Sequence, residues 1–243
     1  MVRFPEFISA EEVELIRDEA LRHRASHPDA GGTLYLQHEG LHPLLAPIVE
    51  RIHDRVWRLD AEVWGLNAVH DLEGVSGLHH RPANQDAAVS DSDEPSASWS
   101  FCTSGAMQPR TIEFHEYGTA RGRKVCCNHC DHGSLFTADV MLSPTNEFEG
   151  GGMVTTVVEE GKAATHMRHA FEKGDLLVFP AHKPHSVERV TSGTRTVFVV
   201  EFWRGPACTC NARCMGACRQ KALRSSAHIP LVYQTPGCRH SHP

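Results

Sequence analysis

Two early segments of the chain repeat apolar residues at the spacing of an amphipathic helix. Ser9 and Glu12 form an S-x-x-E capping pattern, which predicts a first helix from Ala10 to about His23. Its apolar positions recur at steps of three and four residues: Val13, Ile16, Ala20 and Leu21.

The segment HPLLAPIVERIHDRVWRLD, residues 42–60, has the same periodicity and predicts a second helix. Its apolar positions are Leu45, Ile48, Val49, Ile52, Val56 and Trp57. We expect the apolar stripes of both helices to cover a sheet.

From Trp99 to Trp203 the pattern changes to short β-prone runs without helical segments between them. The runs are ASWSFCTSG, TIEFHEYG, KVCCNHCD, LFTADVMLS, GGMVTTVVEE, ATHMRHAF, DLLVFPA, HSVERV and TRTVFVVEFW. Turn signals separate them, at Ser143-Pro144, Gly150-Gly151-Gly152, Gly174-Asp175 and Ser192-Gly193. Closely spaced strands predict a mainly β sandwich or barrel with flanking N-terminal helices.

We expect one domain in three parts. Residues 1–98 form the helical support and a flexible loop, residues 99–204 form the β core, and residues 205–243 form a cysteine-rich tail. Within the first part, residues 80–98 are rich in Ser, Asp, Ala and Pro and poor in large apolar residues, which predicts a solvated loop. A lid over a site is the alternative for that loop.

Composition narrows the function classes. The 243 residues are 40% hydrophobic and 22% charged, as in a folded globular protein. A net charge of −6 provides no broad basic surface, so nucleic-acid binding is disfavoured. No apolar run reaches the roughly 18 residues of a membrane span, and the first residues do not resemble a secretion signal. Nine cysteines, several of them close together, favour reduced thiols or metal ligands, so we expect an intracellular, cytoplasmic protein.

The stretch CCNHCDHGSLF, residues 126–136, concentrates metal-ligating side chains. Cys127 and Cys130 have a C-x-x-C spacing that suits zinc, whereas His129 and Asp131 form an H-x-D pair that suits non-haem iron. In a strand, His129 and Asp131 would share one face while Cys130 points to the other. Buried, non-ligating cysteines are a further interpretation.

A third ligand is available in FPAHKPHSVERVTSGTRTVFVVEFW. His185 opens a predicted strand there and completes a set of two histidines and one carboxylate, which leaves metal positions open for substrate and dioxygen. Arg195, ten residues later, begins the next predicted strand after a Ser-Gly turn. His182 and His132 are the local rivals; His182 fits the step to Arg195 less well, and His132 has the wrong parity.

This ordered set resembles the 2-oxoglutarate- and iron(II)-dependent dioxygenases, and most of all their prolyl-4-hydroxylase-like group. The segments FEGGGM and KGDLLVFPAHKPHSVERVTSGTR are also similar to that family's strands, and the resemblance covers roughly Ile112 to Trp203. It implies a double-stranded β-helix (jelly-roll) core.

The resemblance also implies a role for each site residue. His129, Asp131 and His185 would bind Fe(II), and Arg195 would pair with the distal carboxylate of 2-oxoglutarate. Tyr117 would add a hydroxyl donor, although its distance from His129 in sequence is wider than in the family, and Thr137 is a weaker candidate for the same pocket. Ascorbate is a further implied cofactor.

The implied activity is hydroxylation of a C–H bond with 2-oxoglutarate and O2, giving succinate and CO2. The substrate is a prolyl or other residue of a polypeptide, with a small molecule as the alternative. The presence of Asp131 favours hydroxylation over halogenation, because halogenating relatives lack this carboxylate.

A different class of function stays open. A non-catalytic β-helix module could bind zinc through Cys127, Cys130 and tail cysteines and act in protein interaction. In the tail, Cys208, Cys210, Cys214 and Cys218 form a C-x-C-x3-C-x3-C array, for which a structural zinc site and disordered or redox-labile thiols are the two interpretations.

Overall fold

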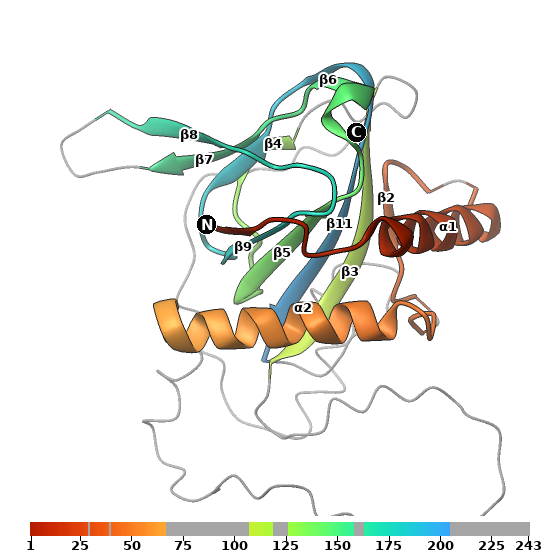
Figure 1. Ribbon diagram of the computed structural model, residues 1–243. Helices are drawn as coiled ribbons and strands as arrows, with labels where there is room; N and C mark the ends of the chain where they lie inside the picture. The colour runs from red at the N-terminus through yellow and green to blue at the C-terminus, as the bar shows by residue number, and fades with distance from the viewer. Residues whose placement is uncertain (29, 39, 67–106, 119–125, 158–162, 205–243) are drawn as a thin grey trace, which may run out of the picture.

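The computed structural model describes residues 1–28, 30–38, 40–66, 107–118, 126–157 and 163–204. These residues form helices α1 (Ala10–Ser26) and α2 (Ala46–Leu59) and two antiparallel sheets (Figure 1). The larger sheet contains β1 (Val2–Phe4), β2 (Thr33–Tyr35), β3 (Gln108–Gly118), β5 (Phe136–Met141), β6 (Phe148–Gly150), β9 (Leu176–Pro180) and β11 (Val190–Trp203). The smaller sheet contains β4 (Cys126–His129), β7 (Met153–Val157), β8 (Thr165–His169) and β10 (His185–Val187).

The strand pairing is nested. Apart from the short edge strands β1, β2 and β6, the pairs are β3 with β11, β4 with β10, β5 with β9, and β7 with β8. The first strand of this series therefore pairs with the last, as in one long hairpin rolled on itself. From the outermost pair inward, successive pairs belong in turn to the larger sheet and to the smaller sheet. This arrangement is a jelly roll, or double-stranded β-helix, and it confirms the predicted fold class.

Helix α1 begins where the capping pattern predicts. The Ser9 hydroxyl accepts from the Glu12 backbone N–H, and the Glu12 carboxylate accepts from the Ser9 N–H, so two amides that a helix start leaves unpaired are satisfied. The helix continues to Ser26, three residues beyond the predicted end. Leu21 is 65% exposed, so its assignment to the buried stripe was wrong.

Helix α2 begins at Ala46, with a proline in its first turn, and a π-helical turn, Asp60–Trp64, follows it. Its buried stripe lies over the larger sheet, and truncating a member such as Ile52 to Ala should cost about 2–5 kcal/mol of stability. Trp57 is 43% exposed, because it lies beside the stripe, so this assignment was also wrong.

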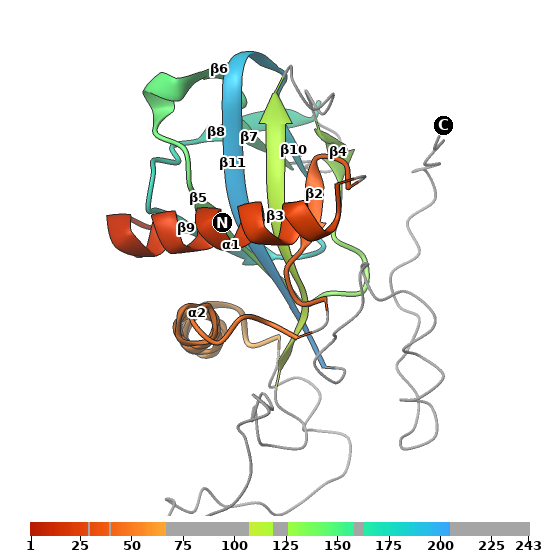
Figure 2. The same cartoon turned by 90° about the vertical axis from the view of Figure 1, so that its right-hand side faces the viewer.

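The two faces of the larger sheet have different partners. Its outer face carries alternate residues such as Phe114, Val140 and Phe198, which pack with α1 and α2 in one apolar core (Figure 2). The inner face carries the residues between them and faces the smaller sheet across a second core that includes Tyr117, Met141 and Phe179. The inner face also carries many of the buried polar residues, and it contains the candidate site.

The turn predicted at Ser192-Gly193 is not a break between strands. Strand β11 runs from Val190 through Arg195 to Trp203, and the chain bends at Gly193, whose φ is 72°. A Cβ there would lie on the Glu147 carbonyl oxygen, so only glycine permits this approach of β11 to the segment before β6.

Several predictions fall outside the described residues. These are the run ASWSFCTSG, the loop at 80–98 and the cysteine-rich tail, so the three-part division of the chain stays a prediction. Within the described residues, neither helix has the length and apolar character needed to cross a membrane.

Candidate functional site

His129 and His185 lie directly opposite each other on neighbouring antiparallel strands. His129 ends β4, His185 begins β10, and the two are register partners. Residues opposite each other in an antiparallel pair place their side chains on the same face, and the two ring centroids are 4.3 Å apart. Long-range strand pairing thus joins two histidines that are 56 positions apart in the sequence.

Asp131 completes the group, but it does so from a turn. Strand β4 ends at His129, so the expectation that Asp131 shares a strand face with His129 was wrong. The Asp131 backbone N–H instead donates to the Ala181 carbonyl at 2.8 Å, which fixes the turn against the chain before β10. The Asp131 carboxylate then lies 3.4 Å from His129 Nε2 through Oδ1 and 3.6 Å from His185 Nε2 through Oδ2.

These three residues, which we call the sheet cluster, bring one donor atom each to within 4.8 Å of one another. Asp131 is 2% exposed and His185 is 5% exposed, whereas His129 is half-buried. A buried carboxylate between two imidazoles, one of them half-buried, is suited to a divalent cation.

Contacts around the sheet cluster orient its donor atoms. His185 Nδ1 lies 3.0 Å from the Lys183 carbonyl oxygen, which can only accept, so Nδ1 carries the proton and Nε2 keeps its lone pair for a metal. The Thr137 hydroxyl donates to Asp131 Oδ2 at 2.6 Å. The ring of Phe179 meets the His185 ring edge to face at 4.8 Å and limits its rotation. Both the donor set and its orientation fit Fe(II), which two histidines and one carboxylate bind on one face.

Arg195 lies on the inner face of β11, directly opposite Tyr117 on β3. It is 1% exposed, and its guanidinium carbon lies 5.2 Å from the Tyr117 ring centroid and 5.8 Å from that of Phe171. The glycine-rich segment packs against it, because a Cβ at Gly151 would lie 2.8 Å from Arg195 Cδ. Aromatic rings and close backbone approach therefore keep this guanidinium inside the barrel.

Asp139 is an interior carboxyl that the sequence pattern did not identify. It lies on β5 between Thr137 and Met141, the inward-facing residues on either side of it, and is 8% exposed. Burial raises the pKa of Asp139 to about 7, and the charge of Asp131 acts in the same direction. The charge of Arg195 opposes this shift in pKa, so the two groups influence each other within one interior.

A second polar row follows the inner face of β3. Thr111 donates to Glu113 Oε1 at 3.0 Å, and Glu113 Oε2 lies 2.5 Å from His115 Nε2. The His115 ring stacks on Tyr117 at 5.8 Å, and its other nitrogen lies 3.3 Å from the Thr33 hydroxyl. The alternation of polar residues in TIEFHEYG was the signal that could have identified this row, because residues two apart share a strand face.

The rivals of the sheet cluster lie elsewhere. His182 and His132 are exposed, and within the described residues neither belongs to a group that could bind a metal. The Cys130 thiol lies 3.1 Å from the His182 carbonyl oxygen and is not part of the sheet cluster. The Cys127 side chain and the four tail cysteines lie outside what the structure describes, so the C-x-x-C and tail zinc interpretations stay predictions.

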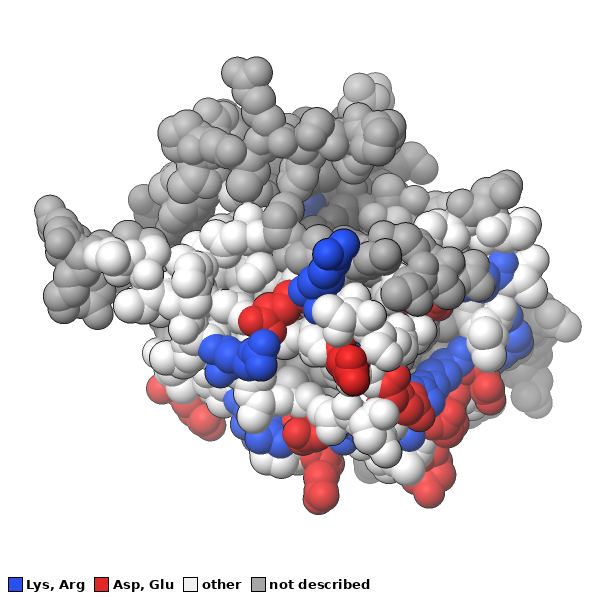
Figure 3. All heavy atoms as spheres, turned by 90° about the horizontal axis from the view of Figure 1, so that it is seen from above, with Lys and Arg blue, Asp and Glu red and all other residues white. Residues whose placement is uncertain are grey.

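One face of the molecule is mixed in charge. Figure 3 shows acidic and basic side chains interspersed over the described part of one face. A surface cavity of about 340 Å³ is lined by residues that include Trp64, Thr156, His182 and Lys183. No residue of the sheet cluster lines this cavity, so it borders the chain leading to His185 without defining the site.

No protein-family model matches this sequence, and no curated protein matches it. Solved structures do match. One is a Pseudomonas putida prolyl-4-hydroxylase, at 14% identity and a TM-score of 0.47, over 84% of this chain and 91% of that protein. Another is a collagen prolyl hydroxylase of Paramecium Bursaria Chlorella virus-1, at 12% identity and a TM-score of 0.46, over 83% of this chain and 88% of that protein.

A third match is an oxidoreductase of the 2OG-Fe(II) oxygenase family from Burkholderia pseudomallei, at 19% identity and a TM-score of 0.33. It covers 44% of this chain, which in turn spans only half (50%) of that protein. Since the identities and TM-scores are low, the jelly-roll assignment depends on the nested strand pairing described above.

Proposed function

We propose that this protein is an Fe(II)- and 2-oxoglutarate-dependent dioxygenase that hydroxylates a C–H bond, with succinate and CO2 as co-products. The observation that carries the proposal is the sheet cluster, in which His129, Asp131 and His185 bring their donor atoms within 4.8 Å of one another inside a jelly roll. Two imidazoles and one carboxylate are typical of iron sites that keep positions open for further ligands.

Each residue has a role that follows from its surroundings. When bound, Fe(II) with 2-oxoglutarate and O2 would supply the oxidising chemistry. Asp131 contributes the one negative charge of the ligand set, and Thr137 fixes the orientation of its carboxylate. The Lys183 carbonyl holds the proton of His185 on Nδ1, so that Nε2 is ready to bind the cation.

Arg195 is the group proposed for the distal carboxylate of 2-oxoglutarate. A guanidinium forms two parallel hydrogen bonds with a carboxylate, and burial among Tyr117 and Phe171 strengthens such a pair by excluding water. Tyr117 lies against Arg195 and is the proposed hydroxyl donor to the same carboxylate.

The substrate that we propose is a prolyl or other residue of a polypeptide, and ascorbate is the proposed supporting reductant. The sequence resemblance suggests this substrate class, and two of the matching structures named above are prolyl hydroxylases.

The test is succinate formation from 2-oxoglutarate by anaerobically purified protein reconstituted with Fe(II) and then exposed to O2. His185→Ala should abolish this activity, and His182→Ala is the matched control, because that exposed histidine lies three residues away and outside the sheet cluster. Mass spectrometry of a peptide library or lysate treated with the active protein should then reveal a product heavier by one oxygen atom.

Two results would contradict the proposal. One is full succinate formation by His185→Ala. The other is purified protein that contains stoichiometric zinc, released by Cys127→Ser or Cys130→Ser, and shows no iron-dependent turnover; the non-catalytic zinc module would then be favoured.

A further inference from the structure

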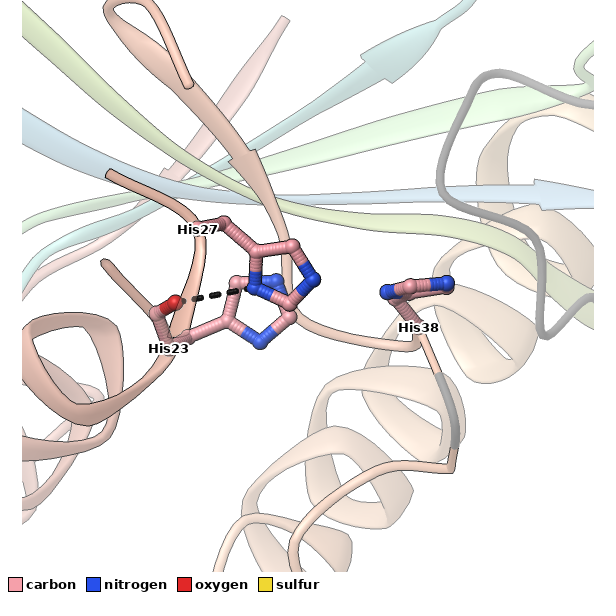
Figure 4. A group of neighbouring side chains, drawn as sticks. All are labelled: His23, His27 and His38. Atoms are coloured by element: carbon pink, nitrogen blue, oxygen red, sulfur yellow. Dashed lines mark hydrogen bonds between the residues drawn. The ribbon is translucent and has the colours of Figure 1, made fainter. Parts of the chain in front are cut away.

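A second group of three histidines lies on the opposite side of the larger sheet from the sheet cluster. His23 and His27 come from the C-terminal end of α1, and His38 comes from the turn that follows β2 (Figure 4). One ring nitrogen from each lies within 4.8 Å of the other two. We call this group the helix cluster.

Local geometry explains why the first two meet. His23 and His27 are four residues apart, so they lie on the same face at the end of the helix, and their rings stack at 4.4 Å. His38 is brought to them by tertiary structure. Strand β2 pairs with β3, the chain turns as His38 N–H donates to the Tyr35 carbonyl, and the His38 ring meets the His27 ring at 5.2 Å.

The protonation of His27 is fixed in a way that suits a ligand. His27 Nδ1 lies 3.0 Å from the His23 carbonyl oxygen, which can only accept, so Nδ1 carries the proton. Nε2 of His27 therefore keeps its lone pair, the arrangement found in metal-bound histidines whose other nitrogen donates to a carbonyl. Figure 4 shows this hydrogen bond and the His38 ring beside the His27 ring, with its edge toward it.

His38 supplies an independent observation. Its Nδ1 is buried and has no hydrogen-bond partner among the described residues. Buried polar atoms are nearly always paired with protein, water or a bound ion, so this nitrogen, which lies beside two further imidazoles, is available to a bound ion. The C-terminal end of a helix also carries partial negative charge, which favours a cation at this position.

We propose that the helix cluster binds a divalent transition-metal ion, Zn²⁺, through His23, His27 and His38, with water as the fourth ligand. Three neutral imidazoles suit zinc, and the absence of a carboxylate among the three distinguishes this group from the sheet cluster. Tetrahedral zinc with bonds of about 2.0 Å needs nitrogens roughly 3.3 Å apart, so the His23 and His27 rings must rotate out of their present stacking to aim their lone pairs at one ion.

Such an ion would connect the end of α1 to the segment that leads into the barrel. Next to His38, Gln37 donates to the Thr111 hydroxyl and accepts from the Ile112 N–H of β3. Zinc at His38 would restrain that segment and, through it, the polar row on β3. The role that we assign to the ion is therefore structural.

The experiment uses the full chain with Asp131→Ala as the parent, which weakens the sheet cluster, and Zn²⁺ alone as the probe. Equilibrium dialysis should show about one zinc per chain fewer in His27→Ala and in His38→Ala than in the parent, with zinc affinity at this site reduced at least about 100-fold. Zinc should raise the thermal unfolding midpoint of the parent, and this rise should be lost in both variants. His166→Ala, which removes an exposed histidine on β8, is the matched control and should behave as the parent.

Co²⁺ gives a geometric readout, because a tetrahedral site absorbs visible light far more strongly than an octahedral one. The parent should show this strong absorption, and His27→Gln should lose it; this milder change guards against a folding defect in the alanine variants. Zinc uptake and cobalt absorption that are unchanged in the His27 and His38 variants would overturn the proposal, as would an equal loss in His166→Ala. Neither result would bear on succinate formation.

Discussion

The sheet cluster and the helix cluster each bring three donor atoms within 4.8 Å of one another. They differ in the type of donor and in the neighbouring groups that orient the donors. The sheet cluster includes a carboxylate that is 2% exposed and oriented by the Thr137 hydroxyl. The helix cluster has only imidazoles, all half-buried, and one of them has an orphan nitrogen. A carboxylate with oriented neighbours suits an ion that must accept further ligands, whereas three imidazoles joining two elements suit an ion that stabilises the fold.

The difference also extends to the surroundings. The sheet cluster shares its interior with Arg195, Asp139 and Glu113, whose charges affect one another. The helix cluster lies on the helix-covered side of the sheet. The proposed chemistry on an anionic cosubstrate therefore belongs to the sheet cluster and not to the helix cluster.

The largest effect is expected for Asp131→Ala. Loss of the single negative ligand should reduce iron-dependent succinate formation at least about 100-fold, because removing a direct ligand exceeds the effect of removing a residue that orients one. The same variant should still take up zinc at the helix cluster, measured by metal analysis. Unchanged succinate formation would remove the distinction between the two clusters.

Asp139→Asn should change how stability depends on pH in the metal-free protein. The pKa of Asp139 is about 7 in the folded chain, against an ordinary value of 3.8. The contribution of its protonated carboxyl to the free energy of unfolding is therefore fully present below about pH 4 and is lost as the pH rises to about 7. Asparagine stays neutral, so the variant should be more stable than the original chain above pH 7, by up to about 4 kcal/mol, with the difference disappearing near pH 4.

Urea unfolding at several pH values measures this difference. Asp18→Asn, on the exposed surface of α1, is the control. A constant offset between Asp139→Asn and the original chain at every pH would contradict the assigned pKa.

Arg195→Ala should raise the KM for 2-oxoglutarate by about 10- to 100-fold, because a charged hydrogen bond contributes about 1.5–3 kcal/mol. Arg195→Lys keeps the charge but not the two parallel donors, so its KM should lie between that of the original chain and that of Arg195→Ala. Steady-state succinate assays measure both variants. If the KM of Arg195→Ala stays unchanged, the carboxylate site must move to another basic residue such as Arg189 or Lys183.

Thr137→Val should have the smallest effect, a loss of about 10-fold in iron affinity, because it removes the donor that orients Asp131 without removing a ligand. Competition of Fe(II) with a chelator measures this affinity. Cys130→Ser is the matched control, since its sulfur contacts the His182 carbonyl and not the sheet cluster. Equal losses in both variants would indicate general loosening of the turn.

The sequence by itself determined what depends on short spacing. The capping box at Ser9, the buried stripe of α2 and the order of most β-prone runs follow from local periodicity, because each concerns residues within a few positions of one another. The resemblance based on the H-x-D pair and on the ten-residue step from His185 to Arg195 likewise pointed to residues that the structure brings into one interior.

Tertiary structure alone decided the features that depend on distant partners. Asp131 reaches the sheet cluster through a hydrogen bond to Ala181, and His38 reaches α1 through the pairing of β2 with β3. The pKa of Asp139 depends on burial and on charges from other strands. Local periodicity contains no information on these contacts, because packing between elements, and not spacing along the chain, sets which side chains share a low-dielectric interior.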